Sequence, residues 1–156
     1  MKYEIERKFL VEGDGWRKSA GPGLPCEQGY ISSGEVTVRV RRIGDQAFLT
    51  LKGRVVGISR SELEYEIPCD EADFMLKNYC GSYVISKVRY RVDVNGSLWE
   101  VDEFFGKNRG LVLAEIELAS EDQPFEKPEW LGREVSYESR YFNGALAKKP
   151  VEEWGD

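Results

Sequence analysis

The sequence predicts a mainly β (α+β) fold, a closed eight-stranded antiparallel β-barrel with a few helices packed outside and one at the C-terminus. About eight segments alternate charged and apolar residues, which is the pattern of strands with one apolar face. Turn signals such as Asn95-Gly96 separate neighbouring segments. Helical segments are too few to cover an open sheet of this size, and closure into a tunnel also removes exposed strand edges.

The elements follow in chain order. Strands are predicted over residues 2–11, 28–32, 35–43, 46–54, 60–67, 83–94, 97–105 and 111–119. A loop over residues 12–25 contains a helical turn near Trp16. A helix begins at residues 68–70 with Asp70 as its N-cap, and Gly81 lies just beyond its end. A capping-box pattern predicts a short helical turn at residues 120–123, and Pro150 stops a closing helix over residues 138–149.

Length and composition limit the classes of function. The 156 residues predict a single domain over residues 1–156, and a net charge of −6 argues against nucleic-acid binding. We see no signal peptide and no run near the about 18 apolar residues of a membrane span. Three cysteines without metal-ligand spacing indicate reduced thiols in a cytoplasmic protein. The chain has no histidine, which excludes Ser-His-Asp triads and the usual zinc sites.

The first strand carries charge on one face. Glu4, Glu6 and Lys8 share this face, and its two carboxylates, about 7 Å apart, repel each other unless a cation lies near. Hard cations such as Mg²⁺ favour carboxylate oxygens. The same alternation recurs on later strands, which contribute Arg39, Arg41, Lys52, Glu62, Glu64, Glu66, Lys87, Arg89, Arg91, Glu100, Asp102, Glu115 and Glu117.

Two structures would produce this pattern. In one, the charged face is a salt-bridged sheet surface in bulk water. In the other, it lines the lumen of a barrel, while the apolar face lies outward under helices and a partner subunit, as in a homodimer. Like charges confined in a lumen raise each other's energy. A ligand with several negative charges, bound together with divalent cations, would relieve both sets, so we favour the lumen.

Eight ordered blocks of the chain resemble the CYTH superfamily, the triphosphate tunnel metalloenzymes, and its small bacterial branch in particular. The signature E-x-E-x-K lies at residues 4–8. The other blocks are V-R-V-R (38–41), L-K-G (51–53), R-S-E-L-E-Y-E-I (60–67), K-V-R-Y-R (87–91), W-E-V-D-E-F (99–104), A-E-I-E-L (114–118) and R-Y-F-N-G-A-L-A (140–147). The resemblance implies an eight-stranded tunnel that processes a triphosphate with Mg²⁺ or Mn²⁺.

The resemblance also implies residue roles. The metal-side acids are Glu4, Glu6, Glu62, Glu64, Asp102, Glu115 and Glu117. The phosphate-binding residues are Lys8, Arg39, Arg41, Lys52, Lys87, Arg89 and Arg140, the last on a C-terminal helix near the tunnel mouth. The catalytic residues are Glu4, Glu6, Lys8 and Lys52. The stretch 136–139 departs from the family pattern, and Glu66, Arg91 and Glu100 lie towards strand ends, where solvation is the simpler role.

The leading functional hypothesis is metal-dependent hydrolysis of inorganic tripolyphosphate to pyrophosphate and phosphate. Class IV adenylate cyclases and thiamine or nucleoside triphosphatases are the enzymatic alternatives within the same fold. A non-catalytic module that binds triphosphate or polyphosphate is an alternative from another class. The simplest alternative is a structural β domain with a salt-bridged face.

Overall fold

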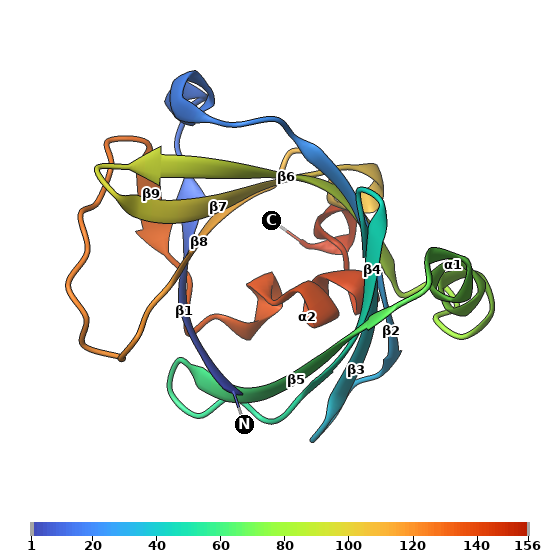
Figure 1. Ribbon diagram of the computed structural model, residues 1–156. Coiled ribbons are helices and arrows are strands. Elements are labelled where there is room, and N and C mark those ends of the chain that lie inside the picture. The colour runs from blue at the N-terminus through green and yellow to red at the C-terminus, as the bar shows by residue number, and fades with distance from the viewer. Residues whose placement is uncertain (1, 156) are drawn as a thin grey trace.

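A computed structural model describes residues 2–155, in which one antiparallel sheet of nine strands forms a barrel (Figure 1). The strands are β1 Lys2–Val11, β2 Leu24–Ser32, β3 Thr37–Ile43, β4 Gln46–Lys52, β5 Ser59–Ile67, β6 Val84–Val94, β7 Ser97–Phe104, β8 Val112–Glu117 and β9 Leu131–Glu134. Their order is β5-β4-β3-β2-β6-β7-β8-β1-β9, and pairing of β5 with β1 closes the ring. The predicted closed barrel of eight strands is therefore confirmed.

The first strand closes the barrel because it has different neighbours along its length. Its first half, Lys2 to Ile5, pairs with β5, and its second half, from Glu6 onward, pairs with β8. The unpredicted ninth strand, β9, pairs with β1 at Phe9 and Val11. Four residues with two nearby prolines gave β9 too weak a pattern to be recognised.

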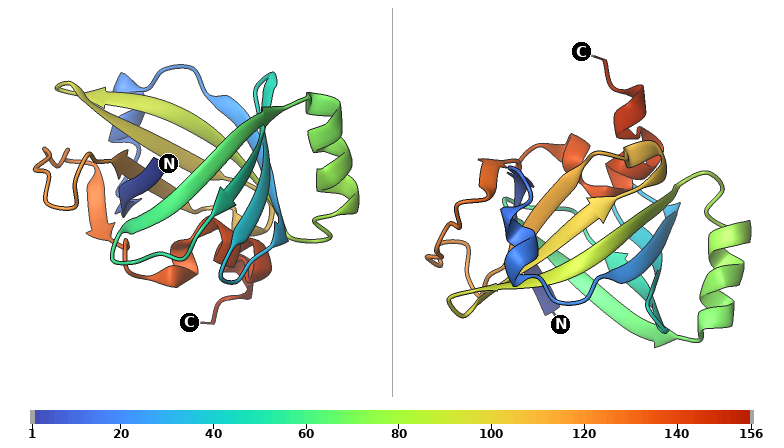
Figure 2. Two further views of the ribbon diagram at one scale, coloured as in Figure 1. Left: turned by 60° about the horizontal axis from the view of Figure 1, so that its bottom comes forward. Right: turned by 90° about the horizontal axis from the view of Figure 1, so that it is seen from above.

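Helix α1, Cys69–Asn78, lies outside the barrel (Figures 1 and 2). Its Ala72 and Leu76 pack with Val40 and Ala47 of β3 and β4. The prediction that Asp70 is the N-cap is wrong, because Pro68 occupies that position with extended dihedral angles. Asp70 instead lies in the first turn, where its charge favours the helix dipole.

The C-terminal helix is shorter than predicted. Helix α2 spans Asn143–Lys148, and 3₁₀ turns over Ser139–Tyr141 and Val151–Glu153 flank it. The expected helix over residues 138–149 fails at Phe142, whose ψ of 139° is extended and interrupts the helical hydrogen bonds. Two views place α2 across one end of the barrel (Figures 1 and 2).

Smaller differences concern loops and strand starts. Strand β2 begins at Leu24, four residues before the prediction, because a proline close to a strand start is tolerated. The predicted turn near Trp16 is the 3₁₀ helix Gly15–Ser19, and a second one covers Gly106–Asn108. The segment 120–123 forms a hydrogen-bonded turn rather than a helix. In the described part of the chain, no helix is long and apolar enough to cross a membrane.

Apolar packing lies on both sides of the sheet. Outside β1, β7 and β8, the ring centroid of Trp99 lies 5.7 Å from that of Phe9 and 5.8 Å from those of Phe125 and Trp130. Inside the barrel, a second cluster fills the end that α2 covers, and it comprises Tyr30, Ile85, Phe104, Leu113, Val135, Tyr141, Leu146 and Ala147. The charged part of the lumen is therefore supported on one side by an apolar plug.

Candidate active site

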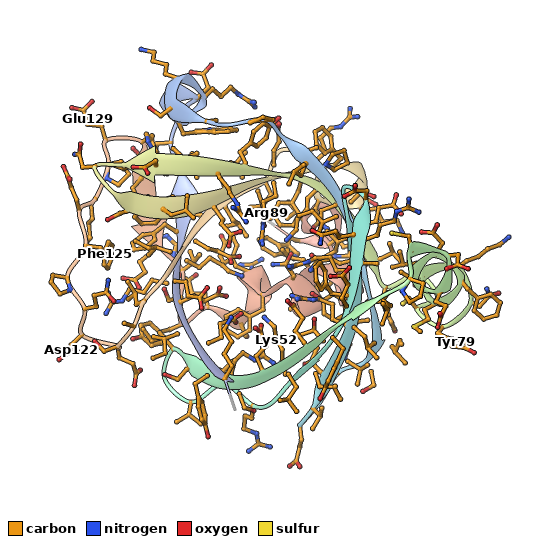
Figure 3. The ribbon with its side chains drawn as sticks, in the orientation of Figure 1. Lys52, Tyr79, Arg89, Asp122, Phe125 and Glu129 are labelled. Atoms are coloured by element: carbon orange, nitrogen blue, oxygen red, sulfur yellow. The ribbon has the colours of Figure 1, made fainter. Side chains whose placement is uncertain are left out.

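The lumen contains a charged cavity of about 630 Å³. Figure 3 shows Lys52 and Arg89 within the ring of strands, whereas Tyr79, which directly follows α1, lies outside it. The predicted residues that line the cavity are Glu4, Glu6, Lys8, Arg39, Arg41, Lys52, Glu62, Glu64, Arg89, Glu100, Glu115 and Glu117. Strand alternation thus placed these charges on the inner face, as expected for a barrel.

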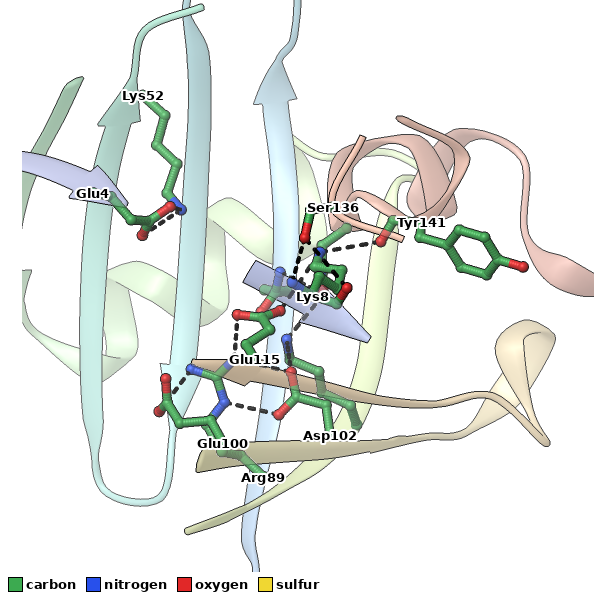
Figure 4. A network of polar contacts seen from close by, with 12 residues as sticks. Glu4, Lys8, Lys52, Arg89, Glu100, Asp102, Glu115, Ser136 and Tyr141 are labelled. Atoms are coloured by element: carbon green, nitrogen blue, oxygen red, sulfur yellow. Dashed lines mark hydrogen bonds and ion pairs between the residues drawn. The ribbon is translucent and has the colours of Figure 1, made fainter. Parts of the chain in front are cut away.

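Lys52 connects two lumen carboxylates. Its Nζ donates to both Glu4 oxygens at 3.0 and 3.1 Å and lies 3.4 Å from Glu62 Oε2 (Figure 4). Burial alone would raise the pKa of Glu4, but the charge and hydrogen bonds of Lys52 outweigh it and lower this pKa to about 2. Burial and the neighbouring Glu4 raise the pKa of Glu62. One lysine therefore holds together two acids that otherwise repel.

Lys8 forms a second acid–base pair deeper in the lumen. Its Nζ lies 3.5 Å from Glu115 and donates to the Tyr141 carbonyl at 3.2 Å, while its backbone N–H donates to Ser136 Oγ at 2.9 Å (Figure 4). Burial opposes charge on Lys8, but Glu115 and Glu6 outweigh it and raise its pKa. Likewise, burial opposes charge on Glu115, yet Lys8 and Arg89 lower its pKa to about 2. The segment after β9 thus fixes Lys8.

Glu6 is the lumen carboxylate whose negative charge is least balanced by nearby basic side chains. Within residues 2–155, no lysine or arginine nitrogen lies within 4.0 Å of its oxygens, and it pairs across the β1–β8 ladder with Glu117. Burial, Glu115 and Glu4 raise the pKa of Glu6 well above its ordinary value. A bound cation near Glu6 would remove this repulsion.

Asp102 and Lys87 share the inner face of β7 and β6 with Arg89, but they lie towards the end that α2 covers and are not part of the cavity lining. Asp102 accepts from Lys87 Nζ at 2.7 Å and from Arg89 Nε and Nη2 at 2.8 and 2.9 Å. Arg89 also reaches Glu100 at 3.2 Å. Both Asp102 oxygens accept hydrogen bonds from cations in the free protein, so its role as a metal ligand stays a prediction. Asp102 orients Arg89, which does line the cavity.

Arg39 and Arg41 bring excess positive charge to the opposite wall. Arg39 Nη2 contacts Thr50 Oγ1 at 3.3 Å and Glu64 at 3.5 Å, while its buried Nε has no partner. Arg41 Nε donates to Gln28 at 3.0 Å, and no carboxylate within residues 2–155 lies within 4.0 Å of its guanidinium. Burial, Arg39 and Arg89 lower the pKa of Arg41. Such a wall would bind an anion strongly.

The carboxylates have the donor chemistry of a site for a hard divalent cation. Glu4 and Glu62 are close enough to share Lys52, and Glu6 lies on the same face of β1. Among the described residues, however, no three acidic side chains converge on one point. Lys52 stands between Glu4 and Glu62, so a cation bound by these two carboxylates would displace it.

The side chain of Arg140 packs against Trp154. Its guanidinium carbon stacks 3.7 Å from the ring centroid of Trp154, and the residue belongs to a 3₁₀ turn rather than to α2. The cavity lining does not include it. The neighbouring Ser139 does line the cavity, so Arg140 lies near its edge, and its role in substrate binding stays a prediction. The expected helix does not carry it, because α2 starts three residues later.

Sequence reasoning missed several cavity residues. Arg60 and Lys2 share faces with Glu62 and Glu4, so strand alternation could have identified both. Arg60 Nε donates to the Gly53 carbonyl at 3.0 Å. Further lining residues come from β2 and the C-terminal segment, among them Tyr30, Ser136, Asn143 and Lys148. Strand alternation gives no signal for the C-terminal ones, although Asn143 lies within the R-Y-F-N-G-A-L-A block, because only tertiary packing brings that segment to the barrel end.

A closed barrel whose lumen combines a basic wall with an acidic wall has the charge distribution of a tunnel protein suited to a polyanion bound together with cations. The CYTH domain family model matches residues 2–149, and the chain belongs to the CYTH family. This confirms the resemblance that the sequence motifs indicated.

Relatives support the assignment over nearly the whole chain. An inorganic triphosphatase from Acetivibrio thermocellus is 50% identical over 151 residues, which is 96% of each chain. An inorganic triphosphatase from Nitrosomonas europaea is 40% identical over 152 residues, 92% of this chain and 96% of the relative. The crystal structure of the inorganic triphosphatase NE1496 superposes with a TM-score of 0.67 at 35% identity, covering 92% of this chain and 96% of that one.

Proposed function

We propose that the protein is a divalent-metal-dependent inorganic triphosphatase that hydrolyses tripolyphosphate to pyrophosphate and phosphate within the barrel. The observation that carries this proposal is the pair Arg39 and Arg41. Both guanidinium groups face the lumen. The buried Nε–H of Arg39 has no hydrogen-bond partner, and the Arg41 guanidinium has no carboxylate within 4.0 Å in the described chain. Such groups are costly to bury unless an anion binds there. The names of the relatives support the same activity.

The basic side chains have a clear division of roles. Arg39, Arg41 and Arg89 hold fixed positions in the lumen wall and bind phosphate oxygens by charge-assisted hydrogen bonds. Lys8 and Lys52 exchange their glutamate partners for phosphate oxygens when substrate enters. Lys87 supports Arg89 through Asp102 from the end of the barrel that α2 covers.

The acidic side chains fit Mg²⁺ or Mn²⁺, which prefer oxygen donors. The cation-binding carboxylates we propose are Glu4, Glu6, Glu62, Glu64, Glu115 and Glu117. Lys52 releases Glu4 and Glu62 as it turns to the phosphate, and Lys8 releases Glu115 in the same way. When bound, the cation supplies charge neutralisation of the phosphate groups and activation of water.

The remaining catalytic contributions come from the chain itself. The arginine wall holds the triphosphate extended, and Lys8 and Lys52 stabilise charge that develops on the transferred and leaving groups. Because the chain has no histidine, one of the lumen glutamates accepts the proton of the attacking water. Glu4, Glu6, Lys8 and Lys52 are thus the proposed catalytic residues.

The test is a phosphate-release assay with tripolyphosphate, ATP, thiamine triphosphate and long-chain polyphosphate, each with Mg²⁺ and with Mn²⁺. We expect the highest kcat/KM with tripolyphosphate. Cyclic AMP is measured in the ATP reactions, because a cyclase releases pyrophosphate instead of phosphate. Binding of tripolyphosphate without phosphate release under any condition would indicate a binding module and contradict the proposal.

We also propose a cytoplasmic location, which the three free cysteines support. A homodimer stays a prediction. Tyr3 and Tyr65, which are 63% and 54% exposed on β1 and β5, mark the outer surface on which it would form.

A further inference from the structure

The first residue of α2 touches the wall of the lumen. Asn143 Oδ1 accepts a hydrogen bond from Lys87 Nζ at 2.9 Å and a second one from Gln28 Nε2 at 3.3 Å. Lys87 belongs to β6 and Gln28 to the neighbouring β2. A residue from outside the barrel strands therefore joins two adjacent strands.

The partners fix the orientation of both amide groups. Lysine can only donate, so the oxygen of Asn143 must face Lys87. Arg41 Nε also can only donate, and its bond of 3.0 Å places Oε1 of Gln28 on that side. The amide nitrogen of Gln28 then faces Asn143 and the Tyr30 hydroxyl, which it reaches at 2.8 Å. One network therefore connects Arg41, Gln28, Asn143 and Lys87.

Burial makes this network sensitive to the loss of any member. Gln28 is 0% exposed and Lys87 is 2% exposed, so water cannot readily replace a missing acceptor. Without the Asn143 oxygen, Lys87 would keep Asp102 as its one acceptor in the described chain. A buried ammonium that loses an acceptor moves or pulls its remaining partner. Here that partner, Asp102, also orients Arg89.

We propose that Asn143 is a positioning residue by which the C-terminal segment aligns the arginine wall for triphosphate. Its oxygen holds Lys87, which sets the Asp102–Arg89 pair, and it holds Gln28, which sets Arg41. The inference rests on the proposed function and extends it, because it makes affinity for tripolyphosphate depend on a residue outside the strands. Asn143 acts through these neighbours and not by chemistry of its own.

The experiment measures the Kd for tripolyphosphate by calorimetry in EDTA, together with KM and kcat in Mg²⁺. We expect Asn143→Ala to raise Kd and KM about tenfold, since a hydrogen bond to a charged group is lost, with a smaller change in kcat. Leu146→Ala is the matched control. It removes a fully buried side chain of α2 that makes no polar contact, so it should lower Tm at least as much and change Kd less than about twofold.

A double-mutant cycle with Gln28→Leu separates positioning from a general effect on stability. Because both substitutions remove the same hydrogen bond, their effects on Kd should fall short of additive. Additive effects, or a Kd for Asn143→Ala within twofold of wild type, would overturn the inference while leaving the proposed function intact. Wild-type protein that neither binds nor hydrolyses tripolyphosphate would overturn both.

Discussion

Lys87 and Asp102 form an ion pair of 2.7 Å whose side chains are 0% and 2% exposed. Arg89 binds the same carboxylate through two nitrogens, so one aspartate balances two cations. Burial opposes charge on Asp102, yet Arg89 and Lys87 outweigh it and hold its pKa well below the ordinary value. The lumen wall therefore depends on a buried charge cluster that is already complete without ligand.

Removing Asp102 should destabilise the barrel strongly. Asp102→Ala leaves two buried cations without compensation, and we expect it to cost about 3–5 kcal/mol in the free energy of unfolding, measured with denaturant. Asp73→Ala removes the partner of Arg42 in a more exposed pair. This control should cost less than about 1 kcal/mol. Equal effects of the two substitutions would show that the buried cluster is not a stabilising element.

The contribution of Asp102 should depend on pH. Its pKa is lower in the folded protein than in the unfolded chain, so its stabilisation is complete above the unfolded value of 3.8 and is lost as pH falls towards the folded value. The difference in unfolding free energy between wild type and Asp102→Asn should therefore be constant near neutral pH and shrink below about pH 4. A difference that grows on acidification would contradict this assignment.

Arg41 should contribute to tripolyphosphate binding but not to the stability of the fold. Because no carboxylate within residues 2–155 lies within 4.0 Å of Arg41, and Arg39 and Arg89 disfavour its charge, Arg41→Met should leave the unfolding free energy unchanged or raise it. The same substitution should weaken tripolyphosphate binding about 10- to 100-fold, as expected for the loss of charged hydrogen bonds. Chemical denaturation and calorimetry measure the two effects. A strongly destabilised variant would argue against an anion site at Arg41.

Lys52 should compete with the cation. In the free protein it occupies Glu4 and Glu62, so Mn²⁺ should bind weakly until tripolyphosphate recruits the lysine. Lys52→Met should abolish most turnover, yet tighten Mn²⁺ binding in the absence of substrate by about tenfold. Calorimetric titration with Mn²⁺ tests this. Lys77→Met is the control, since Lys77 is exposed on α1 outside the barrel, and it should change both quantities little.

Arg140 should be dispensable for binding. Its guanidinium stacks on Trp154 outside the cavity, so Arg140→Ala should change KM for tripolyphosphate by less than about twofold and lower Tm slightly. Lys8→Ala, in contrast, should remove most activity, because Lys8 lines the lumen. A large rise in KM for Arg140→Ala would require the C-terminal segment to move during catalysis.

Most of the barrel was predictable from alternation alone. Strand β1 has the predicted bounds, and the face with Glu4, Glu6 and Lys8 does point into the lumen. The bounds of the C-terminal elements were harder to predict from the sequence. Strand β9 is four residues long, and α2 begins late, at Asn143, because the preceding Phe142 is extended. This segment packs against the end of the barrel.

The sequence by itself determined which charges share a face, because successive side chains of a strand alternate strictly. Only the tertiary structure decided which charges meet. The stagger of neighbouring strands placed Asp102 between Lys87 and Arg89, left Glu6 and Arg41 without opposite partners within 4.0 Å in the described chain, and set Lys52 against Glu4. The docking of α2 then brought Asn143 to Lys87. Such contacts join residues 48 and 56 positions apart, so no local pattern encodes them.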